Sequence, residues 1–338
     1  MNFSEITNIN IPEGVVSKIA TLEGVVLWEK DRLPKILVYE TTDDTTVIVP
    51  NVEYLKNNTI ISNTNYSGQK GKIIFQRGLT EIWQNAFLSQ HELTYIEIPE
   101  GITKIGDDCF NATSLSSIYL PNTIESIGNR AFRRTSITEI NMPNSVNYVG
   151  SALFYGCAKL SDVVLSNNLQ TITDSMFYAC IRLKSITIPN SVTSIMDGAF
   201  TGTSLETIKI PNSVISIGDC VFCGVSSLKT VTLSESLKTI GNYAFDGCNI
   251  QPSGDLTPLI IPKNVTDIGD YAFANNTSLR TITSLAMQAP NIKDNTFYCI
   301  AVDIPAKYCI LKVPQGATGY DKWLKKLGQK WSIEYITE

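Results

Sequence analysis

The fold is decided by the stretch Ile186-Thr-Ile-Pro-Asn-Ser-Val-Thr-Ser-Ile-Met-Asp-Gly-Ala-Phe200, because closely similar copies recur along the chain. The next copy is Ile208-Lys-Ile-Pro-Asn-Ser-Val-Ile-Ser-Ile-Gly-Asp-Cys-Val-Phe222, and an earlier copy runs from Ile118 to Phe132. Self-similarity at a fixed period of about 20 to 50 residues indicates one small structural unit that is copied and stacked. We therefore predict a solenoid rather than a domain with one central core.

A phenylalanine closes each copy and sets the period. Successive phenylalanines are 23, 22, 22, 23, 23, 22, 23, 28 and 24 residues apart. They are Phe87, Phe110, Phe132, Phe154, Phe177, Phe200, Phe222, Phe245, Phe273 and Phe297. We predict about ten coils of 22–24 residues in which these rings form one buried spine. The longer interval contains Pro252, Gly254 and Pro258, which are typical of a surface loop.

Each part of the unit L-x-x-I-x-I-P-x-x-V-x-x-I-G-x-x-A-F predicts a local structure. The alternation in L-x-x-I-x-I is typical of a strand with one buried face, and the proline ends that strand because it lacks an amide donor. Asn and Ser after the proline favour a corner. The recurring glycine, as at Gly128 and Gly218, predicts a turn with positive φ, and the A-F piece predicts a bend or a single helical turn.

This unit resembles that of the BspA-type, or Treponema-like, bacterial leucine-rich repeat family, over residues 73–338. The resemblance implies a right-handed leucine-rich repeat solenoid of the α/β type, with short strands on one side and turns or short helical bends on the other. Members are mostly cell-surface proteins of host-associated bacteria and some protists, and are thought to bind host proteins or other cells. The resemblance therefore implies protein binding or adhesion at a cell surface.

The ends of the chain differ from the repeats, as the caps of a solenoid must. Residues 73–313 hold the repeats, and 314–338 form a C-terminal cap in which residues 320–327 read as a short amphipathic helix between final strands. Residues 32–72 are interpreted as a degenerate N-terminal capping coil. Residues 1–31 predict a small strand segment or hairpin and resemble a segment at the ends of phage or prophage structural proteins. An alternative function is therefore a phage structural or receptor-binding component.

Composition narrows the class of partner. The chain of 338 residues has 43% hydrophobic and 17% charged residues and a net charge of −5. It contains no basic tract, which argues against nucleic acid, and no apolar run long enough for a membrane span. Its first residues lack the pattern of a secretory signal peptide, so we expect an extracellular or cell-surface location if such a peptide precedes this sequence in the natural protein.

No residue pattern predicts a catalytic, cofactor or metal site, so we expect neither an enzyme nor a cofactor. Cys220 and Cys223 form a C-x-x-C motif without a second pair, and they flank the core residue Phe222, which favours a structural role over metal or redox chemistry. The single His91 is interpreted as an exposed loop residue. The remaining candidates are read as inward thiols, mostly free, and as acidic turn residues rather than calcium ligands: Cys157, Cys180 and Cys248, and Asp43, Asp44, Asp107 and Asp108.

The strongest functional candidate is the outward face of the strands. Residues between inward-pointing Ile and Leu must face out, and stacking aligns them in two columns that we expect to line a concave binding side. The alternative is an ordinary solvated sheet face. The candidate binding face comprises Tyr95, Glu97, Tyr119, Glu139, Asn141, Asp162, Thr187, Lys209 and Thr232. We predict a monomer that binds a protein or glycan through this face.

Overall fold

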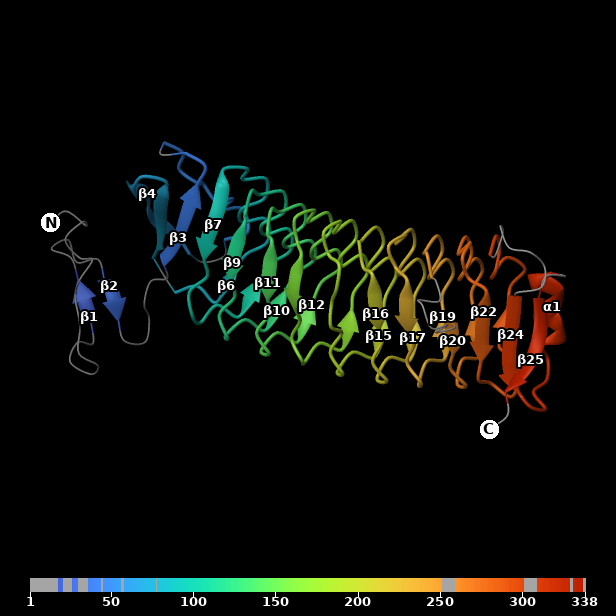
Figure 1. Ribbon diagram of the computed structural model, residues 1–338. Helices are drawn as coiled ribbons and strands as arrows, with labels where there is room; N and C mark the ends of the chain where they lie inside the picture. The colour runs from blue at the N-terminus through green and yellow to red at the C-terminus, as the bar shows by residue number, and fades with distance from the viewer. Residues whose placement is uncertain are drawn as a thin grey trace.

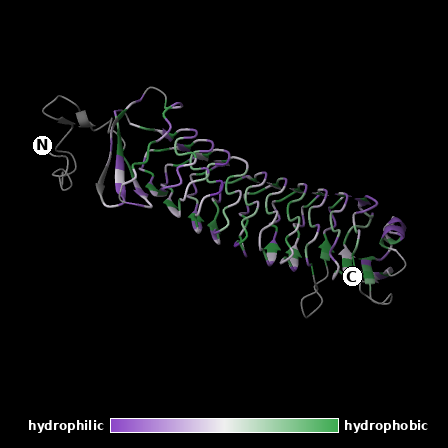
Figure 2. Ribbon diagram, turned by 90° about the horizontal axis from the view of Figure 1, so that it is seen from above, coloured by the Kyte–Doolittle hydropathy of each residue, from purple (hydrophilic) through white to green (hydrophobic). Residues whose placement is uncertain are grey.

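The computed structural model is an elongated rod of stacked coils with a cap at each end (Figure 1). It describes residues 18–20, 26–29, 36–43, 45–55, 58–76, 78–250, 259–300, 309–328 and 331–336. The rod is nearly straight in the two ribbon views, which are related by a quarter turn (Figures 1 and 2). The prediction of a leucine-rich repeat solenoid is confirmed, with turns rather than helices completing most coils.

The L-x-x-I-x-I segments form a parallel sheet along one side, here called the front sheet. Hydrogen bonds join β7 to β9, β11 to β13, β16 to β18, and β20, β22, β24 and β25 in that order. The strands are β7 (Leu93–Glu97), β9 (Ser117–Tyr119), β11 (Glu139–Asn141), β13 (Asp162–Val164), β16 (Thr207–Lys209), β18 (Thr230–Thr232), β20 (Leu259–Ile261), β22 (Thr281–Ser284), β24 (Cys309–Pro314) and β25 (Trp331–Ile336). Between these groups the ladder is interrupted, and residues 185–188 form no strand although their sequence fits the consensus.

A second parallel sheet, which the sequence reasoning missed, is built from the residue pair that precedes the recurring glycine. Its strands have only two residues each, too short for an alternation pattern to show. They are β6 (Glu81–Ile82), β8 (Lys104–Ile105), β10 (Ser126–Ile127), β12 (Tyr148–Val149), β14 (Thr171–Ile172), β15 (Ser194–Ile195), β17 (Ser216–Ile217), β19 (Thr239–Ile240), β21 (Asp267–Ile268) and β23 (Asn291–Ile292). This ladder is interrupted once, between β12 and β14, where Thr173 replaces the glycine and its hydroxyl donates to the Gly150 carbonyl at 2.9 Å.

The segment around each phenylalanine, for which the sequence predicts a bend or a single helical turn, is a turn and not a helix. Around nine of the ten phenylalanines the residues two before and two after have positive φ, for example Asn85 at 57° and Ser89 at 59° around Phe87, and at Phe297 only Cys299 does. Alternate backbone N–H groups here donate to the next coil, as from Phe87 to the Cys109 carbonyl at 2.8 Å, and those between them donate within the turn, as from Leu88 to the Asn85 carbonyl at 3.2 Å. Because the first kind of bond runs between coils, the turn becomes a third hydrogen-bonded column of the stack.

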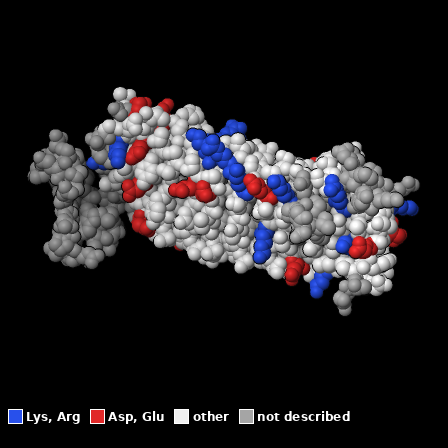
Figure 3. All heavy atoms as spheres, viewed as in Figure 1, with Lys and Arg blue, Asp and Glu red and all other residues white. Residues whose placement is uncertain are grey.

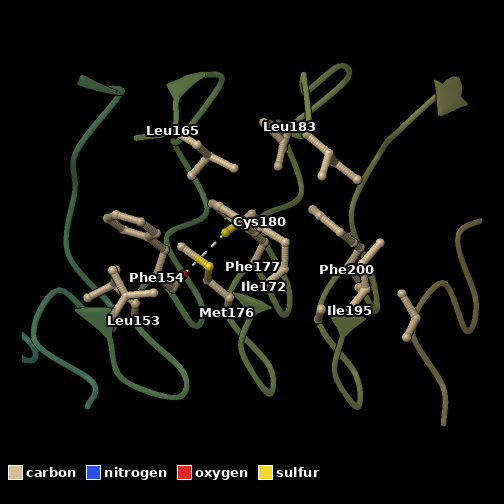
Figure 4. Packing of buried hydrophobic residues seen from close by; sticks show 14 of the residues in the cluster. Leu153, Phe154, Leu165, Ile172, Met176, Phe177, Cys180, Leu183, Ile195 and Phe200 are labelled. Carbon is tan, nitrogen blue, oxygen red and sulfur yellow. Dashed lines mark hydrogen bonds between the residues drawn. The ribbon is translucent and has the colours of Figure 1, made fainter. Parts of the chain in front are cut away.

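The ten phenylalanine rings stack into one spine through the rod. Neighbouring ring centroids lie 5.1–5.8 Å apart, with interplanar angles of 1–17°. Nine of the ten rings are fully buried, and Phe297, at the C-terminal end, is 6% exposed beneath Trp323 of the cap. Figure 4 shows the spine at Phe154, Phe177 and Phe200, surrounded by leucine, isoleucine and methionine from successive coils. The predicted buried spine is therefore present.

The sequence predicts that the recurring glycine is needed for a turn with positive φ, and this reason is wrong. None of the glycines after the second-sheet strands has positive φ: Gly106, Gly128, Gly218, Gly241 and Gly269. They are required because the preceding coil lies against them. A Cβ on Gly106 would lie 2.4 Å from the backbone nitrogen of Gln84. Gly thus allows the coils to approach closely, and the turns with positive φ lie on either side of each phenylalanine instead.

The N-terminal cap consists of antiparallel strands rather than the single coil interpreted from the sequence. Strands β3 (Ile36–Thr41), β4 (Ile60–Ser67) and β5 (Lys70–Phe75) pair in the order β4-β5-β3, and β3 pairs antiparallel with β7 of the front sheet. Before them, β1 (Lys18–Ala20) and β2 (Val26–Glu29) form an antiparallel pair. The other residues of the proposed segment 1–31 lie outside the described residues.

The C-terminal cap contains helix α1 (Asp321–Leu327), whose Trp323 covers the last ring of the spine. Trp323 is 1% exposed, and its indole N–H donates to the Pro290 carbonyl at 3.0 Å. Leu324 and Leu327 pack against the same core. Strand β25 follows the helix and completes the front sheet, so this end of the core is closed by an aromatic side chain.

Candidate functional site

The structure places the predicted binding face on the outside of the front sheet. Eight of its nine residues are exposed, and Tyr95 is half-buried. Strand register brings Glu97 beside Tyr119 in one pair of strands, and Lys209 beside Thr232 in another. These residues form outward rows because alternate positions of each strand are anchored in the core. The rows cross several coils, so side chains far apart in the sequence share one surface.

Tyr95 differs from the rest because it lies where the N-terminal cap meets the repeats. It pairs with Glu40 of β3 in the antiparallel register. Burial raises the pKa of the Tyr95 phenol, and the nearby carboxylates of Glu97 and Glu40 raise it further. Tyr95 therefore remains a neutral hydrogen-bonding group at physiological pH, at the edge of the face rather than in its middle.

The interruptions of the front ladder create a recess in this face. In the pair β11–β13 the Met142 N–H donates to the Val164 carbonyl at 2.9 Å, but the equivalent bond from Leu165 to Thr187 is absent from this described segment. Hydrogen-bonded strands lie about 4.8 Å apart, and the Leu165 N–H and the Thr187 carbonyl are not joined in this way. The sequence predicts a concave face, whereas the rod is nearly straight, and the hollow shown by these residues is local.

This hollow, here called the Asn recess, has a volume of about 520 Å³. It lies across the ends of β11 and β13 and the following coil, and four asparagines contribute to its wall: Asn122, Asn141, Asn144 and Asn167. Val163, Val164 and Thr187 form part of the rest, and no lining residue is charged. The sequence predicts only a corner role for the asparagines that follow the prolines, such as Asn122 and Asn144. Their recurrence after successive strands was the available signal that they align along one rim.

The residues singled out for chemistry do not form a reactive site. Burial raises the pKa of both thiols of the C-x-x-C motif, that of Cys223 to about 11, and the neighbouring Cys220 and Asp246 add to the shift at Cys223. Reactive cysteines require the opposite shift. All eight cysteines lie in the described part of the chain, and none forms a disulfide there. His91 is exposed at a corner.

The inward thiols have a structural role in which they substitute for threonine. Each donates a hydrogen bond to the carbonyl of the phenylalanine in the preceding coil, and Figure 4 shows the bond from Cys180 to Phe154. In coils with threonine at this position, the hydroxyl bonds the phenylalanine of its own coil, as Thr203 does with Phe200 at 2.8 Å. These thiols bind turns together and are unavailable to ligands.

The acidic pair Asp107–Asp108 also supports the stack. Asp107 accepts a hydrogen bond from the Asn129 backbone at 2.8 Å, and Asp108 forms an ion pair with Arg130 at 2.6 Å. Asp43 accepts bonds from Thr45 and Thr46, while Asp44 lies outside the described residues. Within the described ranges, no three His, Cys, Asp or Glu side chains come together as a metal-binding group. No helix there is long and apolar enough to cross a membrane.

The repeated coils, the phenylalanine spine and the outward sheet define the class of leucine-rich repeat solenoids. The family model described as "BspA type Leucine rich repeat region" matches residues 45–161, 148–254 and 251–306 with six copies. The chain belongs to this family, as its repeat pattern predicted. Comparison with curated proteins finds no match.

Solved structures with similarity to this chain are bacterial leucine-rich repeat proteins. A leucine rich cell surface protein from Faecalibacterium prausnitzii is 26% identical, with a TM-score of 0.46, over 74% of this chain and 66% of that protein. The chain therefore spans slightly less than two thirds of that relative. Pneumococcal vaccine antigen PcpA is 19% identical over 77% of this chain and 85% of its own, with a TM-score of 0.39. The Leucine Rich Repeat protein of T. pallidum is 23% identical over 57% and 79%, with a TM-score of 0.36.

Proposed function

We propose that this chain is a non-catalytic binding module that recognises a protein or glycan at a cell surface through its front sheet. The observation that carries the proposal is the row of exposed side chains that successive coils present on one face, over a buried phenylalanine spine. Tyr119 is 59% exposed in this row. Exposed tyrosine supplies apolar contact area together with a hydroxyl, a combination that is enriched at recognition surfaces.

Family membership and the name of the Faecalibacterium relative, a leucine rich cell surface protein, support the location at a cell surface. We propose that the chain acts there as a monomer, because both ends of its spine are covered by caps. The alternative role in a phage particle stays a prediction. Most of residues 1–31, on which it rests, lie outside the described residues.

A matched pair of tyrosines tests the proposal. Tyr119 lies on the front sheet, and Tyr148, which is 56% exposed, lies on the second sheet. The purified chain is applied to a panel of host matrix proteins, glycans and whole cells, and bound protein is measured by biolayer interferometry or flow cytometry. We expect binding to at least one member, reduced by Tyr119→Ala and unchanged by Tyr148→Ala. Absence of all binding, or equal loss from both variants, would contradict the proposal.

A further inference from the structure

We propose that the Asn recess binds a neutral oligosaccharide. The inference rests on the proposed function and names the ligand class of one part of the front sheet. The recess volume of about 520 Å³ lies within the range of about 300–1,000 Å³ that is typical of small-molecule sites. It therefore has room for a few sugar rings in contact with the wall.

The charge of the recess excludes some ligand classes. Its lining contains amides, a hydroxyl and apolar groups but no acidic or basic side chain. Figure 3 shows the charged side chains of this view as separate groups with uncharged surface between them. A sulfated or sialylated glycan, or a peptide with charged side chains, would lose hydration on entering the recess without gaining an ion pair there. A neutral ligand has no such cost.

The hydrogen-bonding groups of the recess are suited to sugar hydroxyls. The side-chain amides of Asn122, Asn141 and Asn167 form no hydrogen bond with any described residue, and each offers two donors and an acceptor. Asn144 is different, because its Oδ1 accepts a bond from the Asn167 backbone at 2.9 Å. A sugar hydroxyl donates and accepts at once, so neighbouring hydroxyls can pair with both ends of one amide.

The break in the ladder adds backbone groups to this set. The Leu165 N–H and the Thr187 carbonyl, which an uninterrupted sheet would join, have no partner among the described residues. Both residues line the recess. They supply one more donor and one more acceptor at fixed positions, set by the coils rather than by mobile side chains.

An apolar surface for the carbon face of a sugar ring lies beside these polar groups. Val164 is 58% exposed within the recess, and Tyr119 is 59% exposed two coils nearer the N-terminus on the same outward row. Rings such as that of tyrosine are amphipathic and pack well against partly apolar, partly hydroxylated ligands. The recess and Tyr119 together would accommodate an oligosaccharide lying along the rod axis.

Isothermal titration calorimetry on the full chain tests the proposal with cellohexaose, xylohexaose, mannohexaose, maltohexaose and chitohexaose as probes. We expect at least one probe to bind, and the double variant Asn141→Ala/Asn167→Ala to weaken its affinity at least ten-fold. Both asparagines are exposed, so the variant should retain the circular dichroism and melting temperature of the parent. Asn147→Ala, at an exposed asparagine directly before β12 of the second sheet and outside the recess, is the matched control and should change the affinity less than two-fold.

The proposal is overturned if no probe binds at millimolar concentration, or if the double variant binds as tightly as the parent. These outcomes can be told apart from failure of the proposed function. If the chain binds none of the five oligosaccharides but binds a protein in a Tyr119-dependent manner, the oligosaccharide proposal fails and the proposed binding function stands. A chain that binds a sulfated oligosaccharide in preference to the neutral probes also overturns the proposal.

Discussion

Replacing one ring in the middle of the spine should destabilise the solenoid strongly and locally. Phe177 is fully buried and stacks between Phe154 at 5.5 Å and Phe200 at 5.4 Å. Truncation of a buried phenylalanine to alanine costs about 3–5 kcal/mol through lost transfer energy and the cavity left behind. Two stacked neighbours place Phe177→Ala towards the upper part of this range, since each aromatic pair adds about 0.5–1.5 kcal/mol.

The assay is native-state hydrogen exchange, because each coil of a solenoid contacts only its neighbours and global unfolding need not be two-state. The Phe177 N–H donates to the Ala199 carbonyl at 2.8 Å, so its exchange reports the local stack. A loss of 4 kcal/mol corresponds to exchange faster by roughly three orders of magnitude. Ile181→Ala, at a side chain 57% exposed, is the control and should change stability by no more than about 0.5 kcal/mol.

The reasoning is refuted if Phe177→Ala costs less than about 1 kcal/mol, or if the control costs as much. It is also refuted if amides at the far end of the rod, such as that of Phe87, lose protection to the same degree. A uniform loss would mean that the coils share one cooperative core instead of a chain of neighbour contacts.

Three further results are expected. Gly241→Ala should cost about 1–3 kcal/mol in urea unfolding, because its Cβ would lie 2.4 Å from the preceding coil, whereas Gly224→Asn, with φ of 70° and open space, should cost little. Cys223, with its pKa raised to about 11 by burial, should alkylate on the order of 100-fold more slowly at pH 8 than an unhindered thiol. Asp43, whose pKa is lowered to about 2, chiefly by hydrogen bonds from Thr46, should titrate near that pH by carboxyl NMR, and its stabilising effect should fade as pH falls from about 4 to 2.

Each of these three predictions has an outcome that would contradict it. Equal stability of the two glycine variants would remove the close approach of the coils as the reason for glycine at Gly241. Rapid labelling of Cys223 at neutral pH would show a thiolate and reopen a chemical role for the C-x-x-C motif. For Asp43, folding lowers the pKa, so the contribution to stability must be present above the unfolded value and lost in acid. A carboxyl that titrates at its ordinary value would contradict the hydrogen bonds described.

The phenylalanine period was enough to predict the solenoid, its spine and the outward residues, because those features depend on repeated side chains. The positions of Phe177 and Tyr119 within the repeat were enough to predict that Phe177 is buried and that Tyr119 is exposed. The second sheet was not predictable in this way, since strands such as Ser216–Ile217 are too short to alternate. The reason for the recurring glycine was not predictable, because a sequence does not distinguish a residue that needs positive φ from one that needs room for the neighbouring coil.

The Asn recess could not be predicted from the sequence either. It depends on the ladder being broken between Val164 and Thr187, and residues 184–188 follow the consensus as well as any other copy. The second sheet is interrupted in the same part of the rod, between β12 and β14. Such interruptions of the two sheets depend on how neighbouring coils stack, which the sequence of a single copy does not show.

Hydroxyl-radical footprinting of the chain on the surface it binds tests the front sheet most directly. Tyr119 and Tyr148 are 59% and 56% exposed, so they should be oxidised to similar extents in the free chain. Binding through the front sheet predicts that labelling of Tyr119 falls several-fold while that of Tyr148 is unchanged. Protection of Tyr148 with continued labelling of Tyr119 would place recognition on the second sheet and contradict the account.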